Sequence, residues 1–331
     1  MQITADPIDS CLLDDWQRDF PVTLRPFARM AEVLGVAEDD VLKRLEVMRQ
    51  IGRITRVGAT CAPNAVSAST LATIAVPDDR IEEVAAIIND EPGVNHSYLR
   101  ENQWNLWFVA TGPERAFVDA ALKNIEARSG LRVLDLRLVR PFNLDLGFRL
   151  SGPRGETAPK PRNPDLSQIM SGDRAILHGL TQGLDLVAAP YEALAQKLGR
   201  SETGVLERIA ALQEADIISR LGVIVRHRAL GWRANAMVVW ELSSEQIDVA
   251  GPKLATMPGV TLCYERRPVP EVWPYRLYSM IHARDRSEAE GLLEAAAALP
   301  ELQGVPHVAL FSNRCFKQTG AMIAKQAGCA A

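Results

Sequence analysis

Two widely separated segments of the chain carry hydrophobic residues at the three- and four-residue spacing of an amphipathic helix. They are PFARMAEVLG, residues 26–35, and PYEALAQKLG, residues 190–199, and both end at a glycine suited to a left-handed helix cap. A short turn and a second amphipathic run follow each, VLKRLEVMRQIG in one case and ETGVLERIAALQEA in the other, with Ser201 as a predicted N-cap. Two helices joined by a short turn and followed by a strand pair beginning ITRVG or ISRLG indicate a winged helix-turn-helix.

Downstream of each helix pair, alternating or β-rich runs replace the helical pattern. In the first half they are RVGATC, STLATIAVP, VNHSYLR, NLWFVAT and LRVLDLRLV, separated by the helical runs RIEEVAAIIND and ERAFVDAALKNIEARS. The second half repeats this order, with helices around EQIDVAGPKLATM and RSEAEGLLEAAAAL. The order βαββαβ predicts a four-stranded antiparallel sheet with two helices on one face, the ferredoxin-like plan. The expected fold class is α+β, in two tandem copies of a winged helix-turn-helix plus a ferredoxin-like (Lrp/AsnC-like) domain.

The two halves are copies of one unit. Residues 26–58 and 190–222 align without a gap, and further matches run through the sheet segments. A repeat this long is no solenoid and indicates a fused dimer, while the proline-rich stretch between the copies reads as a semi-extended tether. Matching pairs include Arg44/Arg208, Gly58/Gly222, Gly93/Gly259, Tyr98/Tyr264 and Arg100/Arg266. The predicted domains are 1–56 and 172–220 (winged helix-turn-helix), 57–150 and 221–331 (ferredoxin-like), and 151–171 (linker).

Composition narrows the class of protein. A net charge of −4 gives no global attraction to nucleic acid or to an anionic membrane. Five scattered cysteines without a CxxC pair argue for a reducing compartment and against a structural zinc site. The first residues lack a basic region and an apolar core, and no apolar run reaches the roughly eighteen residues of a membrane span. We therefore expect a cytoplasmic protein.

A helix-turn-helix followed by βαββαβ resembles the Lrp/AsnC family of regulators over the whole chain, so one interpretation is a DNA-binding transcription regulator. The charges of the second helices argue against it, because phosphate neutralisation supplies most DNA affinity. The first begins with Glu38, Asp39 and Asp40, and such an end repels a phosphodiester backbone. The second carries more acids than bases. The acidic residues are Glu202, Glu207, Glu214 and Asp216, and the basic residues are Arg200 and Arg208. These helices are expected to serve packing and dimer-type contacts.

Aromatic residues and arginines gather in a few segments of the sheet domains although aromatics make up only 6% of the chain. The segments are RHRALGW (226–232), CYERRPVPEVWPYRLYSMIH (263–282), NHSYLRENQWNLWF (95–108) and LFSNRCFKQTG near the C-terminus. Flat rings beside guanidinium groups predict a pocket for a large planar ligand with several carboxylates. The candidate ligand-binding residues are Tyr98, Arg100, Arg226, Arg228, Tyr264, Arg266, Trp273, Tyr275 and Lys317.

These same motifs resemble the siroheme decarboxylases, Lrp-like enzymes of alternative heme and heme d1 synthesis. In that family two related subunits form the enzyme, and in some denitrifying bacteria they are fused, as the two unlike copies here would be. The resemblance implies removal of the C12 and C18 acetate carboxyl groups of siroheme, giving 12,18-didecarboxysiroheme and CO₂. It implies no added organic cofactor and no protein-bound metal, since the substrate is itself an iron tetrapyrrole to which a histidine can be an axial ligand. Related subunits of the pathway are candidate partners.

Loss of CO₂ from a pyrrole acetate leaves electron density that a proton must quench, and histidine titrates in the required range. His96, beside Tyr98 and Arg100, and His227, inside an Arg-His-Arg triplet, are the candidate proton donors. His178 is interpreted as solvated surface and His307 as surface or edge. His282 remains open between a functional residue and a satisfied polar one.

The first copy has CAPNAVSAS where the second has the Arg-His-Arg triplet. Only one of the two quasi-equivalent sites is therefore expected to be complete, with the triplet from the second copy and His96 from the first. Whether it forms within one chain or between chains stays open, as does the order of the two decarboxylations. We expect an intramolecular pseudo-dimer, alone or paired with a second copy. A regulator and a heme-carrying protein without catalysis are the alternative functions.

Overall fold

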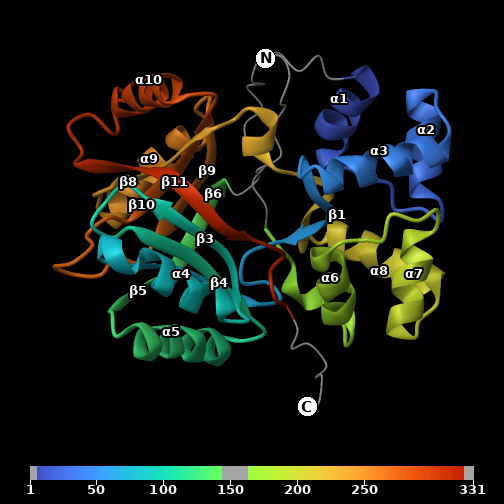
Figure 1. Ribbon diagram of the computed structural model, residues 1–331, viewed down its shortest axis with the longest axis horizontal. Helices are drawn as coiled ribbons and strands as arrows, with labels where there is room; N and C mark the ends of the chain where they lie inside the picture. The colour runs from blue at the N-terminus through green and yellow to red at the C-terminus, as the bar shows by residue number, and fades with distance from the viewer. Residues whose placement is uncertain (1–5, 144–162, 324–331) are drawn as a thin grey trace. The chain divides into compact units, whose positions relative to one another are not determined.

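The computed structural model describes residues 6–143 and 163–323, and these form two compact units (Figure 1). The helix-turn-helix unit contains residues 6–66 and 163–230, and the sheet unit contains 67–143 and 231–323. Each unit therefore combines one segment from each copy. The expected boundaries after residues 56 and 220 fall inside strands, and the division lies ten residues later in both copies.

The α-helices and the strand of the helix-turn-helix unit follow the same order in both copies, while the short 3-10 helices (η) differ in position. Gly35 and Gly199 end the first helix of each pair with φ of 68° and 63°, which confirms the predicted left-handed caps. Ser201 caps the second helix of its pair by accepting from the Gly204 N–H, as predicted. The elements of the first copy are α1 (Pro7–Asp14), η1 (Asp15–Gln17), α2 (Pro26–Leu34), α3 (Glu38–Gln50) and β1 (Ile54–Cys61). Those of the second are η3 (Leu166–Gln168), α6 (Asp173–Gln182), α7 (Pro190–Leu198), α8 (Glu202–Glu214), β7 (Ile218–Val225) and η4 (His227–Leu230).

The strand pair of this unit is shared between the copies. We predicted a strand pair within each copy, but β1 pairs antiparallel with β7, and Gly58 lies opposite Gly222. The segment after α1 crosses β7, with the Phe20 N–H donating to the Leu221 carbonyl at 3.1 Å. Leu184, after α6, donates to Val57 in the quasi-equivalent contact at 2.8 Å. The two copies are thus joined through backbone hydrogen bonds as well as side chains.

The sheet unit contains two βαββαβ modules, which confirms the predicted order. The run RVGATC is no part of it, because those residues form β1. The first module has β2 (Ala68–Ile74), η2 (Asp78–Arg80), α4 (Ile81–Asp90), β3 (Val94–Arg100), β4 (Leu106–Gly112), α5 (Arg115–Ser129), β5 (Val133–Leu136) and β6 (Leu138–Asn143). The second has β8 (Ala234–Trp240), α9 (Ser244–Ala255), β9 (Val260–Arg266), β10 (Leu277–Ala283), α10 (Arg286–Ala297) and β11 (His307–Gln318).

The strands form one nine-stranded sheet instead of two separate four-stranded sheets. Its order is β5-β2-β4-β3-β11-β8-β10-β9-β6. The last strand of each module crosses to the other: β11 pairs with β8 and then with β3, while β5 pairs with β2 and β6 continues onto β9. This exchange joins the two modules in one sheet.

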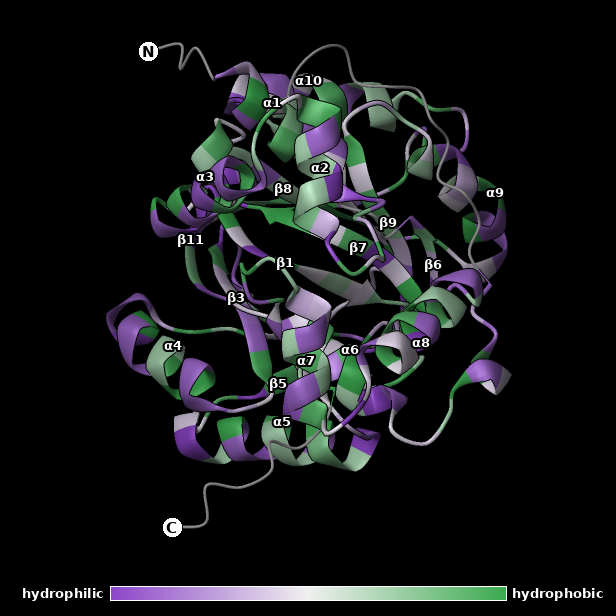
Figure 2. Ribbon diagram, turned by 90° about the vertical axis from the view of Figure 1, so that its right-hand side faces the viewer, coloured by the Kyte–Doolittle hydropathy of each residue, from purple (hydrophilic) through white to green (hydrophobic). Residues whose placement is uncertain are grey.

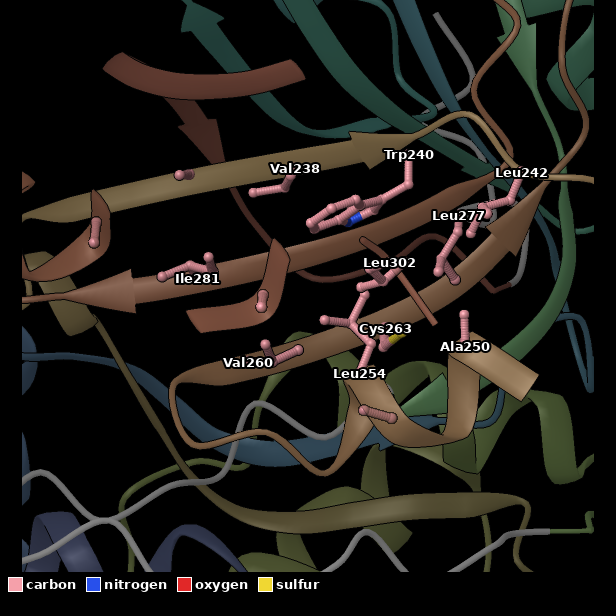
Figure 3. Close-up of a cluster of buried hydrophobic side chains, with 14 of the residues drawn as sticks. Val238, Trp240, Leu242, Ala250, Leu254, Val260, Cys263, Leu277, Ile281 and Leu302 are labelled. Carbon is pink, nitrogen blue, oxygen red and sulfur yellow. The ribbon is translucent and has the colours of Figure 1, made fainter. Parts of the chain in front are cut away.

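Three hydrophobic cores stabilise the sheet unit. One lies under α4 and α5, and a second lies under α9 and α10, where side chains of β8, β9 and β10 gather around Ala250 and Leu254 (Figure 3). The third joins residues of both modules on the helix-free faces, among them Leu71, Trp107 and Tyr278. Hydrophilic and hydrophobic residues mix along α2 and α4, as expected of helices with one buried side (Figure 2).

Residues 151–162 of the expected linker lie outside the described residues, and its remaining part, 163–171, contains η3. Among the helices of residues 6–143 and 163–323, none has the length and apolar character to cross a membrane.

Candidate functional site

Three of the predicted site residues form a row on β3. His96, Tyr98 and Arg100 occupy alternate positions, so their side chains share one face of the strand. The rings of His96 and Tyr98 stack with centroids 6.4 Å apart, and the Arg100 guanidinium carbon lies 5.4 Å from the Tyr98 centroid. Leu99 packs into the core on the opposite, helix-covered face. The strand thus presents an imidazole, a phenol and a guanidinium side by side on the helix-free face.

Arg100 is tied to the second module by a buried polar chain. Its Nη1 donates to the Asn235 Oδ1 at 3.1 Å and to the Leu310 carbonyl at 3.0 Å. The Asn235 Nδ2 is 2.7 Å from the His282 Nε2, and the His282 Nδ1 is 2.7 Å from the Thr261 Oγ1. Arg100 is 6% exposed and His282 is 7% exposed. The open question about His282 is answered in part, since both its ring nitrogens have partners.

Arg266 holds the quasi-equivalent place in the second module. Its Nη1 donates to the Leu136 carbonyl at 2.7 Å, just as Arg100 donates to Leu310. Its guanidinium lies 4.6 Å from the Tyr264 ring centroid and 6.0 Å from that of Tyr278. The rings of Tyr264 and Tyr278 therefore lie beside Arg266, whereas Arg100 has the Tyr98 ring and the Asn235 amide as neighbours.

Tyr264 and Trp273 lie inside the third core, 5% and 3% exposed. The Trp273 indole N–H donates to the Tyr278 hydroxyl at 2.8 Å, and its ring lies 5.4 Å from that of Trp107. Burial raises the pKa of the Tyr278 phenol. We expected Tyr264 and Trp273 to stack on a ligand, but here they pack on protein, because the proline-rich insertion folds Trp273 back onto the sheet. Tyr275, half-buried, contacts Trp273 at 4.9 Å.

The Arg-His-Arg triplet lies at the end of β7, in the helix-turn-helix unit. Arg226 and Arg228 are exposed and His227, the first residue of η4, is half-buried. The Arg226 backbone N–H donates to the Arg53 carbonyl at 2.8 Å, which holds the triplet beside the end of α3. Two exposed guanidinium groups next to an imidazole can receive carboxylates.

Lys317 has a structural partner in this fold. Its Nζ donates to the Asn89 carbonyl at 2.7 Å, in the last turn of α4, a favourable place for a cation. Desolvation lowers the pKa of this amine.

The two histidines that we interpreted as surface residues differ. His307 is exposed and its ring lies tilted beside that of Trp240, with centroids 4.6 Å apart, in agreement with the interpretation. His178 is half-buried on α6, its Nδ1 has no hydrogen-bond partner within the described residues, and desolvation lowers its pKa. The prediction of a solvated His178 was wrong, because one ring edge faces the protein.

Basic residues of the second helices are engaged in ion pairs within the protein. Arg44 contacts Asp9 at 2.7 Å and Asp40 at 3.0 Å, and its quasi-equivalent Arg208 contacts the buried Asp173 at 2.8 Å. These pairs leave less positive charge for a phosphate backbone. Within residues 6–143 and 163–323, no cluster of three or more histidine, cysteine or acidic side chains could hold a metal ion.

Comparisons with known proteins follow the same division into units. The model of the AsnC-like ligand binding domain matches residues 66–142 and 229–317, and that of the siroheme decarboxylase NirDL-like HTH domain matches 9–54 and 173–218. Fold and site thus define a fused pair of Lrp/AsnC-type subunits. The siroheme decarboxylase NirDL subunit of Paracoccus denitrificans is 54% identical over 325 residues, which cover 98% of this chain and 100% of that protein. The chain belongs to the siroheme decarboxylase family, and it is an enzyme of the carboxy-lyase class.

Two further relatives bear on the site and on the duplication. A crystal structure of the siroheme decarboxylase NirDL in complex with an iron-uroporphyrin III analogue has a TM-score of 0.66 and 27% identity, covering 92% of this chain and 90% of that one. The siroheme decarboxylase NirD subunit of Stutzerimonas stutzeri is 47% identical over 148 residues, 45% of this chain and 97% of that subunit. A separate subunit in one organism thus matches one of the two copies here.

Proposed function

We propose that the chain decarboxylates siroheme to 12,18-didecarboxysiroheme and CO₂, as a step of heme d1 biosynthesis. The observation that carries this proposal is the row of His96, Tyr98 and Arg100 on β3, an imidazole beside a ring and a guanidinium. The family membership of the chain and the tetrapyrrole analogue in a solved relative support it.

The proposed reaction needs only a proton. The bond between the acetate methylene and its carboxylate breaks, CO₂ leaves, and the electron pair on the methylene carbon takes up a proton, which yields a methyl group. We propose His96 and His227 as the general acids, since imidazole can donate a proton near neutral pH. No redox change occurs, so we propose that no added cofactor takes part. The iron belongs to the substrate.

Substrate carboxylates have two suited receptors in the triplet, and we propose that Arg226 and Arg228 bind them. Their exposed guanidinium groups can form bidentate pairs, and the planar macrocycle can pack on Tyr98 and on Tyr275. Arg100 contributes its positive charge from the buried side of Tyr98. The remaining candidates, Tyr264, Arg266, Trp273 and Lys317, support the fold through the contacts described above.

We propose further that only one of the two quasi-equivalent positions in the sheet unit takes part in the chemistry. The position around Arg100 carries His96 and a polar chain. The position around Arg266 has Leu262 in place of His96, and the rings of Tyr264 and Tyr278 lie beside its guanidinium. A position without a histidine offers no imidazole proton.

Anaerobic incubation of the purified chain with siroheme tests the proposal, with the mass of the tetrapyrrole as readout. Loss of two CO₂ units is the expected result. A bound but unchanged tetrapyrrole would instead indicate a heme carrier, and absence of binding would return the regulator to consideration. Either of these outcomes contradicts the proposal.

A further inference from the structure

The buried hydrogen bonds that link Thr261, His282, Asn235 and Arg100 have donor and acceptor roles that chemistry fixes. A guanidinium group can only donate hydrogen bonds, so the Asn235 amide must turn its oxygen toward Arg100 and its NH₂ group toward His282. The His282 Nε2 then has to accept, which places the ring proton on Nδ1. That N–H donates to the Thr261 hydroxyl, whose own proton goes to the Met280 carbonyl at 3.1 Å. Every donor in this row of hydrogen bonds therefore meets an acceptor only when His282 is neutral and carries its proton on Nδ1.

A charged or differently protonated His282 would break this order. A proton on Nε2 would face the Asn235 NH₂ group, and the amide could escape only by turning its NH₂ toward Arg100. Two donors would then meet at the guanidinium, and a buried unmet donor costs on the order of 1–3 kcal/mol. The state of His282 is thus transmitted to Arg100, which lies against Tyr98, which in turn stacks on His96.

The duplication supplies an internal comparison. The positions that match Asn235, Thr261 and His282 in the first copy are Ser69, Asn95 and Thr111, all with shorter or differently shaped side chains. The Thr111 hydroxyl contacts the Gly93 carbonyl at 3.4 Å, and the Nε of Arg266 is buried without an acceptor in the described part of the chain. Both arginines bond a carbonyl of the other module, so the fold alone explains those bonds. Within residues 6–143 and 163–323, a hydrogen-bonded chain of this kind accompanies Arg100, the arginine on the strand of His96, and none is found at Arg266.

We propose that His282 is a positioning residue for decarboxylation. Its neutral ring orients Asn235, Asn235 orients the guanidinium of Arg100, and Arg100 fixes the row of Tyr98 and His96. The proposal rests on the proposed function in that this row is taken as the site of proton transfer. The hydrogen-bond order within the chain can be tested without any turnover.

The first experiment reads the protonation state of His282 in the full chain. With ring-¹⁵N-labelled histidine, NMR separates the two neutral tautomers and the cation, and the His282→Gln spectrum identifies the signals that belong to this residue among five histidines. We expect a neutral ring with the proton on Nδ1 at neutral pH. In Asn235→Asp the carboxylate can no longer donate to Nε2, so we expect the doubly protonated pattern. A wild-type ring with its proton on Nε2 would overturn the proposal whatever the enzyme's activity.

The second experiment measures turnover and substrate binding. His282→Phe keeps a ring of similar size but removes both hydrogen bonds, and we expect kcat to fall about 10- to 100-fold with little change in KM. His282→Gln offers an oxygen to Asn235 and an NH₂ group to Thr261, so we expect it to recover most of the loss. If His282→Phe does not fold, the glutamine variant and the wild-type spectrum still decide. Wild-type kcat in His282→Phe, or an equal loss in His282→Gln, would contradict a positioning role.

If the proposed function fails while the NMR result holds, the wild-type chain will leave siroheme unchanged although His282 shows the expected tautomer. If only the positioning role fails, wild-type turnover will be normal and the spectrum or the variants will deviate. The two failures are therefore distinguishable.

Discussion

Alanine at Gly222 tests whether the two helix-turn-helix segments are held together by the shared strand pair. A Cβ at Gly222 would lie 2.3 Å from the Gln17 carbonyl oxygen and 2.5 Å from that of Trp16, both backbone atoms that cannot rotate away. A Cβ at Gly58, its partner across β1 and β7, would lie 2.4 Å from the Leu180 oxygen. Ordinary contact begins near 3.4 Å, so the crossing segment has to move by about 1 Å.

The expected cost follows from this displacement. Overpacking of a well-filled site costs about 1–3 kcal/mol. The shift also weakens the hydrogen bond from Phe20 to the Leu221 carbonyl, worth about 1 kcal/mol. Replacement of a strand glycine returns roughly 0.5–1 kcal/mol of backbone entropy. The free energy of unfolding should therefore fall by about 1–3 kcal/mol, and the melting temperature of the helix-turn-helix unit by about 3–12 °C.

Differential scanning calorimetry of wild type and Gly222→Ala measures this shift, with Gly291→Ala as the control. Gly291 lies on α10, and a Cβ added there would meet none of the described atoms within 4 Å, so alanine should be neutral or stabilise by up to about 1 kcal/mol. A Gly222→Ala protein that melts with the wild type would refute the close approach of the crossing segment.

Three further predictions concern the site and pH. Alanine at His96 or His227 should slow turnover about 100-fold or more while siroheme binding is retained. Product mass in single-turnover reactions measures the rate, and a spectroscopic titration measures binding. Full activity in both variants would contradict the proposal that these histidines are the general acids. Arg226→Ala should weaken siroheme binding about 10- to 100-fold before it affects the chemical step, and an unchanged Kd would remove Arg226 from the carboxylate receptors. Burial lowers the pKa of His178 in the folded chain. Below about pH 6.5 the unfolded chain therefore binds a proton more readily than the folded chain does, and the free energy of unfolding decreases as the pH is lowered. His178→Asn should flatten the pH dependence of the urea-unfolding free energy between about pH 7 and 5, and a slope equal to that of the wild type would contradict this.

The element order was predictable because the duplication presents each pattern twice. Period and caps place α2, α3 and their counterparts, and Gly35 and Gly199 end the helices where expected. The pairing of β1 with β7 was not predictable, because a strand's own alternation says which face is buried but not which strand lies beside it. The crossing of β11 onto β3 escaped prediction for the same reason.

The site was predictable where it depends on local spacing. Alternate positions put His96, Tyr98 and Arg100 on one face of β3, as in any strand. Composition could not tell that Trp273 is buried in a core instead of facing a ligand, since aromatic residues dominate both kinds of place. The partners of His282 lie on two other strands, at separations of 21 and 47 residues, and only the folded sheet brings them together.

The two copies separate what the fold requires from what the chemistry requires. Arg100 and Arg266 each donate to a carbonyl of the other module, that of Leu310 on β11 and that of Leu136 on β5, so this bond is common to both copies. The other neighbours of the two arginines differ. Around Arg266 the rings of Tyr264 and Tyr278 lie beside the guanidinium. Around Arg100 the Asn235 amide and, beyond it, the His282 imidazole and the Thr261 hydroxyl form a buried polar network, which is expensive to leave partly unpaired. This difference between the copies supports the proposed role of the β3 row, in which His96 stands where the second copy has Leu262.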